Sequence, residues 1–128
     1  MERFRYDVLS GVILDAAISV HKEMGPGLLE SVYQHCMLQE LRSRSILVKE
    51  ACVVPLVYKK EILTKEYVID ILVENEIILE LKAVEKILTV HEAQLISYLK
   101  LADKRLGLLI NFNVPLLKYG FKRFVNGL

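Results

Sequence analysis

The sequence has few of the residues that cross-link, interrupt or anchor a chain. It contains two cysteines, three prolines, six glycines and no tryptophan. Because Cys36 and Cys52 lack CxxC spacing, neither a zinc knuckle nor a disulfide framework is indicated, and we expect buried free thiols. No apolar run approaches the roughly 18 residues that a membrane helix needs, and the first residues lack a signal-peptide layout. These absences predict a cytoplasmic protein with no membrane partner.

A net charge of one sign is also missing. The 17 basic and 16 acidic residues leave a net charge of +1, which argues against a purely electrostatic nucleic-acid binder. Residues 100–128 differ, since they hold six bases and one acid. This segment is either a solvated surface or a phosphate-facing patch beside an acidic site. What the sequence does have is apolar: 53% of its 128 residues are hydrophobic, which predicts one domain over residues 1–128 with its own core.

Hydrophobic spacing predicts two helices in the first third of the chain. Apolar residues recur at i, i+3 and i+4 over residues 8–22, and again over residues 28–44. The segment Met24-Gly25-Pro26-Gly27 separates the two, because glycine permits a tight turn and proline cannot continue a helix.

The apolar pattern then changes from the period of a helix to that of strands. We expect strands over residues 47–58, 64–73 and 77–82, a helix over 91–102, a strand over 106–110 and a last strand over 121–125. The order α-α-β-β-β-α-β(-β) predicts an α/β (α+β) fold in which helices flank a mixed sheet.

A hairpin over residues 64–82 is expected to place two carboxylates side by side. A three-residue loop, 74–76, buries the odd-numbered apolar residues of both strands on one face and pairs Asp70 with Glu80. The odd face would hold Tyr67, Ile69, Ile71, Val73, Ile77, Leu79 and Leu81; the even face would hold Val68, Asp70, Leu72, Ile78, Glu80 and Lys82. Cross-strand neighbours have Cβ atoms about 4.5–5.5 Å apart, so we expect the two carboxylates within about 6 Å and a raised pKa for one of them.

Opposed carboxylates destabilise a sheet unless a cation lies between them. Hard divalent ions prefer carboxylate oxygens, and Mg²⁺ takes one or two carboxylates together with water and phosphate. Lys82 shares the face of Glu80, where its ammonium could hold a phosphate or the attacking water. Asp70, Glu80 and Lys82 are therefore either a metal-assisted phosphodiesterase centre or a solvated hairpin face of mixed charge.

Two helices offer further candidates. Gln94 and Tyr98 are four residues apart and share one face of the third helix with His91; the alternative is an ordinary amphipathic boundary, and His91 is better explained as a helix-start residue than as a ligand. Glu30 lies in the first turn of the second helix, where a carboxylate also simply favours the helix dipole.

Five segments, in order, resemble the GxxExxY protein family. They are Gly27–Tyr33, Asp70, Glu80–Glu85, His91–Leu99 and Gly107–Phe112, and the resemblance covers about residues 8–128. That family belongs to the PD-(D/E)XK nuclease-like superfamily, whose core order is αβββαβ. Two departures stand out: Ile69 precedes Asp70 in place of proline, and Val68 stands where arginine is expected.

The resemblance implies a role for each matching residue. Asp70, Glu80 and the carbonyl of Leu81 would bind Mg²⁺ or Mn²⁺, with Glu30 completing the acidic cluster. Lys82 would position or activate water, and Gln94 and Tyr98 would orient the lysine or a phosphate. The resemblance thus implies a metal-dependent nuclease acting on DNA or RNA. The alternative is a catalytically silent module of the same fold that binds nucleic acid or a protein partner, and a homodimer is compatible with either.

Overall fold

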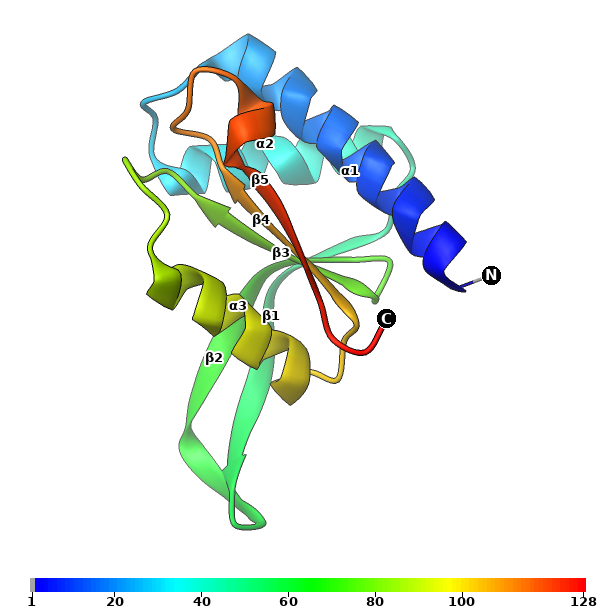
Figure 1. Cartoon of the computed structure of the whole chain (residues 1–128), viewed down its shortest axis with the longest axis vertical. Coiled ribbons are helices and arrows are strands. Elements are labelled where there is room, and N and C mark those ends of the chain that lie inside the picture. Colours follow the sequence, from blue (N-terminus) through cyan, green and yellow to red (C-terminus); the bar gives the residue numbers. More distant parts are fainter. Residues whose placement is uncertain (1) are drawn as a thin grey trace.

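A computed structural model describes residues 2–128, and its elements follow the predicted order (Figure 1). The elements are α1 (Glu2–Met24), α2 (Glu30–Ser43), β1 (Val48–Tyr58), β2 (Glu61–Val73), β3 (Ile77–Lys82), α3 (Thr89–Leu101), β4 (Leu106–Asn111), the short 3-10 helix η1 (Leu117–Gly120) and β5 (Phe121–Val125). The α+β fold expected from the sequence is confirmed.

Helix α1 begins six residues earlier than the spacing of apolar residues predicts. Its first turns are held by contacts with segments distant in the sequence. Arg5 forms a salt bridge with Glu76 in the turn between β2 and β3, and Asp7 forms one with Arg123 of β5 at 2.7 Å. Tertiary contacts of this kind cannot be inferred from local periodicity.

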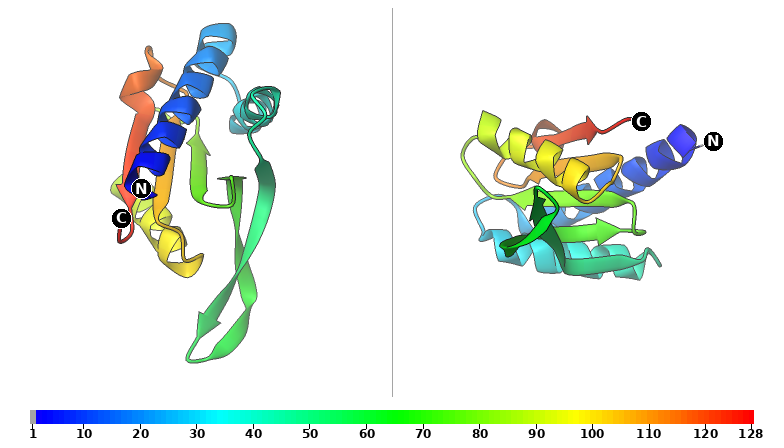
Figure 2. Two further views of the ribbon diagram at one scale, coloured as in Figure 1. Left: turned by 90° about the vertical axis from the view of Figure 1, so that its right-hand side faces the viewer. Right: turned by 90° about the horizontal axis from the view of Figure 1, so that it is seen from below.

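The five strands form one mixed sheet in the order β1-β2-β3-β4-β5. Only the β3–β4 pair is parallel within the described chain, and α3 makes the crossover between these two strands. Helices α1 and α2 lie on one face of the sheet and α3 lies on the other, as the two views in Figure 2 show. The β1–β2 hairpin extends well beyond the rest of the molecule (Figure 1).

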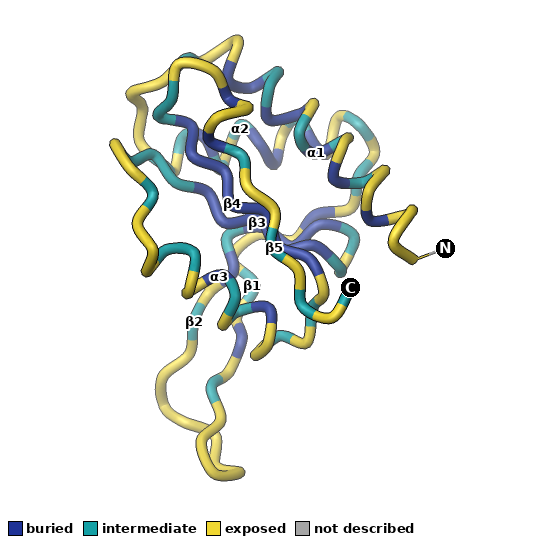
Figure 3. The backbone as a smooth tube through the Cα atoms, viewed as in Figure 1, coloured by how far each residue is buried: buried dark blue, intermediate teal, exposed yellow. Residues whose placement is uncertain are grey.

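Each face of the sheet buries its own apolar cluster. Ile77, Leu79 and Leu81 of β3 pack toward α1 and α2, whereas Ile78 packs toward α3 with Leu95 and Leu99. Figure 3 shows buried residues concentrated on the central strands, while the far end of the hairpin is exposed. The alternating side chains of β3 therefore supply both cores.

The predicted hairpin register is confirmed, but the predicted faces are wrong for part of β2. Val73 pairs with Ile77 and Ile71 with Leu79, so the loop is 74–76 as expected. Ile71 packs toward α1 and α2, yet Tyr67 and Ile69 pack toward α3, on the same side as the even-numbered Leu72.

A sharp local twist explains this error. Opposite Asp70, the β1 residue Ala51 adopts a left-handed conformation, with φ of 50°, and interrupts the ladder between the pairs Glu50–Ile71 and Cys52–Ile69. The twist turns the odd-numbered face of β2 from one helical layer to the other. Alternation of residue types cannot report such a twist, because the pattern of odd and even positions is unchanged on both sides of it.

The basic residues near the C-terminus are mostly engaged within the chain. Lys122 forms a salt bridge with Glu92 and Arg123 one with Asp7, while Lys104 and Arg105 donate to backbone carbonyls. This favours the solvated surface over a phosphate-facing patch. No helix in residues 2–128 has both the length and the apolar character required to cross a bilayer.

Candidate active site

The site begins where strands β2 and β3 separate. Their ladder ends at the pair Ile71–Leu79, and the next bond across the strands comes from a side chain: Asp70 Oδ2 accepts a hydrogen bond from the Leu81 amide at 2.9 Å. A strand residue points its N–H and C=O to the same side, so the Leu81 carbonyl also faces this fork. The carbonyl of Lys82 instead faces β4, where it accepts from the Phe112 amide.

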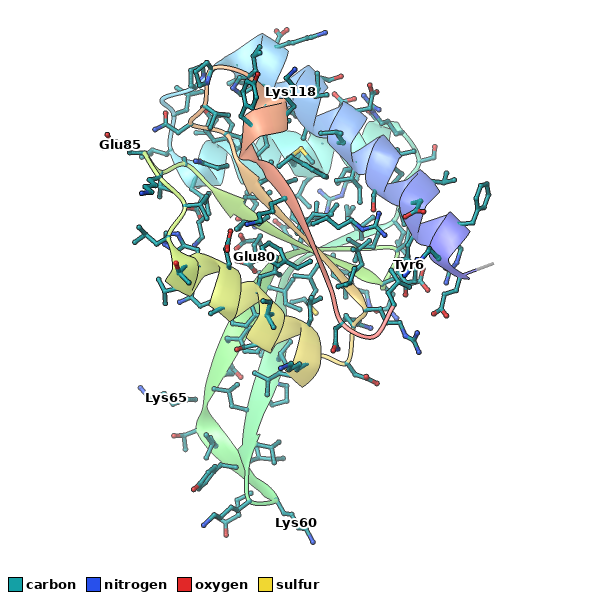
Figure 4. The ribbon with its side chains drawn as sticks, viewed as in Figure 1. Tyr6, Lys60, Lys65, Glu80, Glu85 and Lys118 are labelled. Carbon is teal, nitrogen blue, oxygen red and sulfur yellow. The ribbon has the colours of Figure 1, made fainter. Side chains whose placement is uncertain are left out.

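Glu80 is the most unusual residue of the site. Its side chain lies on the α3 side of β3 (Figure 4), only 8% of the residue is exposed, and Oε1 has no hydrogen-bond partner among residues 2–128. Burial, as the largest cause, and the charges of Asp70 and Glu30 together raise the pKa of Glu80 to about 8. Lys82 and the backbone amide of Asp70 act in the opposite direction on that pKa. Glu80, Asp70, Lys82 and Glu30 therefore share one electrostatic environment.

The pKa of Asp70 is shifted in the same direction as that of Glu80. Burial raises the pKa of Asp70, whereas the hydrogen bond from the Leu81 amide and the charge of Lys82 lower it. The expected direction of the carboxylate shifts is thus found, but the leading cause is loss of water rather than repulsion between like charges. The expected separation of the Asp70 and Glu80 carboxylates, within about 6 Å, stays a prediction.

Glu30 is placed by the loop that precedes α2. Tyr33 is fully buried, stacks on Phe112 with ring centroids 4.5 Å apart, and its hydroxyl donates to the Gly25 carbonyl at 2.5 Å while accepting from the Leu28 amide. Gly27 has φ of 95°, a conformation that L side chains rarely adopt. The glycine and the tyrosine of the Gly27–Tyr33 segment thus fix where α2, and with it Glu30, begins.

Glu30 faces the same charges as the two strand carboxylates. Burial raises the pKa of Glu30, Lys82 lowers it, Asp70 raises it and His91 lowers it. His91 Nδ1 accepts a hydrogen bond from the Leu88 amide at the start of α3, which agrees with its interpretation as a helix-start residue. Gln34, one turn after Glu30, donates to the Asp70 carbonyl at 3.2 Å. Sequence reasoning missed Gln34, although its i+4 spacing from Glu30 was a usable signal.

A tyrosine pair covers the α3 side of the site. Tyr67 and Tyr98 stack with ring centroids 4.0 Å apart, and the Tyr67 hydroxyl donates to the Tyr98 carbonyl at 2.9 Å. Burial, as the largest cause, and the neighbouring Tyr98 and Glu80 together raise the pKa of Tyr67 to about 12. Burial also raises the pKa of Tyr98, with contributions from Glu80 and Asp70. Tyr98 therefore lies beside the strand carboxylates, and Tyr67, three residues before Asp70, is an additional member of the site.

Gln94 is not brought into this cluster. It is exposed on α3, and its side chain forms no hydrogen bond within residues 2–128. Its predicted role in orienting the lysine or a phosphate stays a prediction.

The donors at the fork suit a divalent ion bound by few protein ligands. Glu80 offers a buried oxygen without a partner, and the Leu81 carbonyl faces the same fork as the Asp70 carboxylate. In the described part of the chain, no three His, Cys, Asp or Glu side chains are grouped closely enough to hold a metal. An ion here would thus rely on two carboxylates, a backbone carbonyl and water, the pattern typical of Mg²⁺. Glu30 as a direct metal ligand stays a prediction.

This geometry is that of a nuclease-like fold with clustered carboxylates and a lysine on adjacent strands. The family model for the PD-(D/E)XK nuclease superfamily matches residues 7–124, and the chain belongs to that superfamily. Neither the curated proteins nor the solved structures contain a match to the chain.

Proposed function

We propose that this protein is a nuclease that uses Mg²⁺ or Mn²⁺ to hydrolyse phosphodiester bonds of nucleic acid. The observation that supports this most is Glu80: a buried carboxylate with an unpartnered oxygen, next to Asp70 and under the charge of Lys82. Burying such a group costs stability unless a bound cation compensates it. Membership of the GxxExxY family and a cytoplasmic location are part of the same proposal.

In this proposal Asp70, Glu80 and the Leu81 carbonyl hold the ion, which when bound polarises a phosphate oxygen and acidifies water. Lys82 forms no salt bridge among residues 2–128, so its ammonium is available to hold a phosphate oxygen or a water. Glu30 adds negative charge near Lys82. Tyr98, fixed by Tyr67, closes the site on the α3 side.

The test compares three site variants on fluorogenic single- and double-stranded substrates with Mg²⁺ or Mn²⁺. Lys82→Ala should abolish cleavage and leave the fold and the metal affinity nearly intact, because the lysine supplies charge rather than ligation. Lys82→Arg should be nearly as damaging, since a planar guanidinium does not replace a compact ammonium at one oxygen. Glu80→Ala should lose metal affinity together with cleavage.

Lys22→Ala is the matched control, because Lys22 is exposed at the end of α1. Equal cleavage by the wild type and Lys82→Ala would remove Lys82 from the mechanism and indicate a contaminating enzyme. No cleavage of any substrate by the wild type would instead favour a catalytically silent module that binds nucleic acid or a protein. Light scattering of the purified protein tests the possible homodimer.

A further inference from the structure

The far end of the β1–β2 hairpin has no role in the site or in either core. We call residues 55–66 the distal arm. Every residue in it is exposed except Leu56, which is partly exposed, and no third strand within residues 2–128 pairs with it. Figures 1 and 3 show the arm projecting past α3, away from the rest of the molecule. An exposed ribbon of two strands costs conformational entropy without burying a core.

The arm carries three lysines and two glutamates, Glu61 and Glu66, and two of the lysines stand together at its tip. Lys59 and Lys60 form the turn, both in the left-handed conformation, with φ of 50° and 68°. Lys65 follows on β2, and Figure 4 shows Lys60 and Lys65 pointing away from the ribbon. None of the three forms a salt bridge within residues 2–128, in contrast to the C-terminal bases described above. Unpaired lysines on a projecting turn are suited to contact phosphates.

The arm is also continuous with the site. Strand β2 carries Asp70 at its base and runs without a break to Glu61, next to Lys60. Ten residues of strand separate Asp70 from Lys60, which corresponds to about 33 Å of length. One turn of B-form DNA is about 34 Å long. A duplex whose backbone is held at Asp70 would therefore meet the tip of the arm about one helical turn from the cut.

The edge of the arm is unsuited to pairing with another strand. Pro55 lies in β1, the outer strand, and cannot donate to a ladder, and the register shifts between Pro55 and Val57. The paired residues Val57 and Ile62 are 53% and 75% exposed. Exposed apolar side chains next to a turn of two lysines can contact thymine methyl groups.

From these observations, and resting on the function proposed above, we infer that the distal arm enters the major groove of double-stranded DNA and grips it about one turn from the site. The major groove of B-form DNA admits a two-stranded ribbon. The corresponding groove of duplex RNA is deep and narrow and excludes it. The substrate class is thereby narrowed to duplex DNA.

The experiment measures binding without cleavage, by fluorescence anisotropy in EDTA with a labelled DNA duplex of about three helical turns. The variant is Lys59→Ser with Lys60→Ser. The matched control is Lys100→Ser with Lys118→Ser, which removes two exposed lysines elsewhere. The match is close, because Lys59 Nζ lies 5.4 Å from the Tyr58 ring centroid and Lys118 Nζ lies 5.2 Å from that of Tyr119.

Loss of two phosphate contacts should lower the slope of log affinity against log salt by about 1.8. The affinity deficit of the arm variant should then be about tenfold larger near 50 mM salt than near 200 mM. The control variant should keep the wild-type slope, and an RNA duplex of equal length should show no difference between arm variant and wild type.

The arm and the nuclease proposals fail separately. If duplex binding depends on the arm but no metal supports cleavage, the proposal that the arm binds DNA stands and the proposal of a nuclease is rejected. The proposal that the arm binds DNA is overturned if the protein cleaves DNA but the wild type and the arm variant have equal DNA affinity. It is also overturned if the protein does not bind duplex DNA at all. A third outcome also overturns it: Ile62→Ser converts a dimer to a monomer, and DNA affinity is unchanged, so that the arm would contact a second copy of the chain.

Discussion

The two faces of strand β3 contribute differently to the stability of the protein. Leu79 faces α1 and α2 within a cluster of apolar side chains, and it is fully buried. Its neighbour Glu80 faces α3 and buries a carboxylate that lacks a partner. One residue step along a single strand thus separates a position that stabilises the fold from one that costs stability. The comparison teaches that the α3 side gives up stability to hold charge, a pattern typical of functional sites.

Leu79→Ala should have the largest effect on the stabilising side. Removing a fully buried leucine side chain should lower the free energy of unfolding by about 2–5 kcal/mol, measured by urea denaturation. Metal affinity at a temperature where the variant stays folded should be unchanged, because Leu79 points away from the fork. A loss far below 1 kcal/mol would show that the side chains on this face of β3 repack around the substitution, and that the face is not rigid.

Glu80→Gln should raise the free energy of unfolding near pH 8, whereas Leu79→Ala lowers it. The folded-state pKa of about 8 lies above the ordinary value of 4.5, so the unfolded chain releases the proton first as the pH rises. The wild type therefore loses stability between about pH 4.5 and pH 8, and by pH 8 the loss is of the order of a few kcal/mol. Glutamine does not titrate, so the variant should exceed the wild type near pH 8 and match its stability near pH 4.5.

Glu66→Gln is the control for that experiment, because Glu66 is an exposed carboxylate of the distal arm. Its unfolding free energy should follow the wild type at every pH. A Glu80→Gln variant that gains nothing near pH 8 would mean that Glu80 is solvated, and the contrast across β3 would disappear.

The affinity for a divalent metal ion should depend on pH through Glu80. In the proposed site a divalent ion would bind ionised Glu80, so binding should release a proton below about pH 8. Affinity for Mg²⁺ or Mn²⁺ should rise by up to about tenfold, or about 1.4 kcal/mol, per pH unit in that range. Calorimetry in buffers of different ionisation enthalpy measures the released proton. Chelation by EDTA should lower the stability of the wild type and leave Glu80→Gln unaffected.

Tyr33→Phe should have the smallest effect on stability. The phenyl ring keeps its stacking on Phe112, but the hydrogen bonds with Gly25 and Leu28 are lost. We expect a loss of about 1 kcal/mol, together with weaker cleavage, because the start of α2 and thus Glu30 would be less well fixed. Tyr119→Phe is the control, since Tyr119 is 71% exposed. Equal cleavage by wild type and Tyr33→Phe would show that Glu30 does not depend on this loop.

The sequence predicted the order of the elements and the register of the hairpin because both follow from local patterns. The 74–76 loop could be derived from the odd spacing of apolar residues around Asp70 and Glu80. The faces of Tyr67 and Ile69 could not, since the left-handed Ala51 leaves no mark in the alternation of residue types. Tyr67 was missed because its partner, Tyr98, is 31 residues away in the sequence.

The central place of β3 bears on how the protein opens. From Ile77 to Leu79, β3 is paired on both sides, with β2 and with β4, and Glu80 and Lys82 follow directly, paired with β4. Backbone amides in the doubly paired stretch should exchange with solvent mainly through global unfolding, whereas those of the distal arm, paired on one side only, should exchange through local fraying. We therefore expect Glu80 and Lys82 to keep their places after the distal arm has opened. Metal-dependent turnover would then report the folded fraction of a sample directly, even when the end of the hairpin is already open.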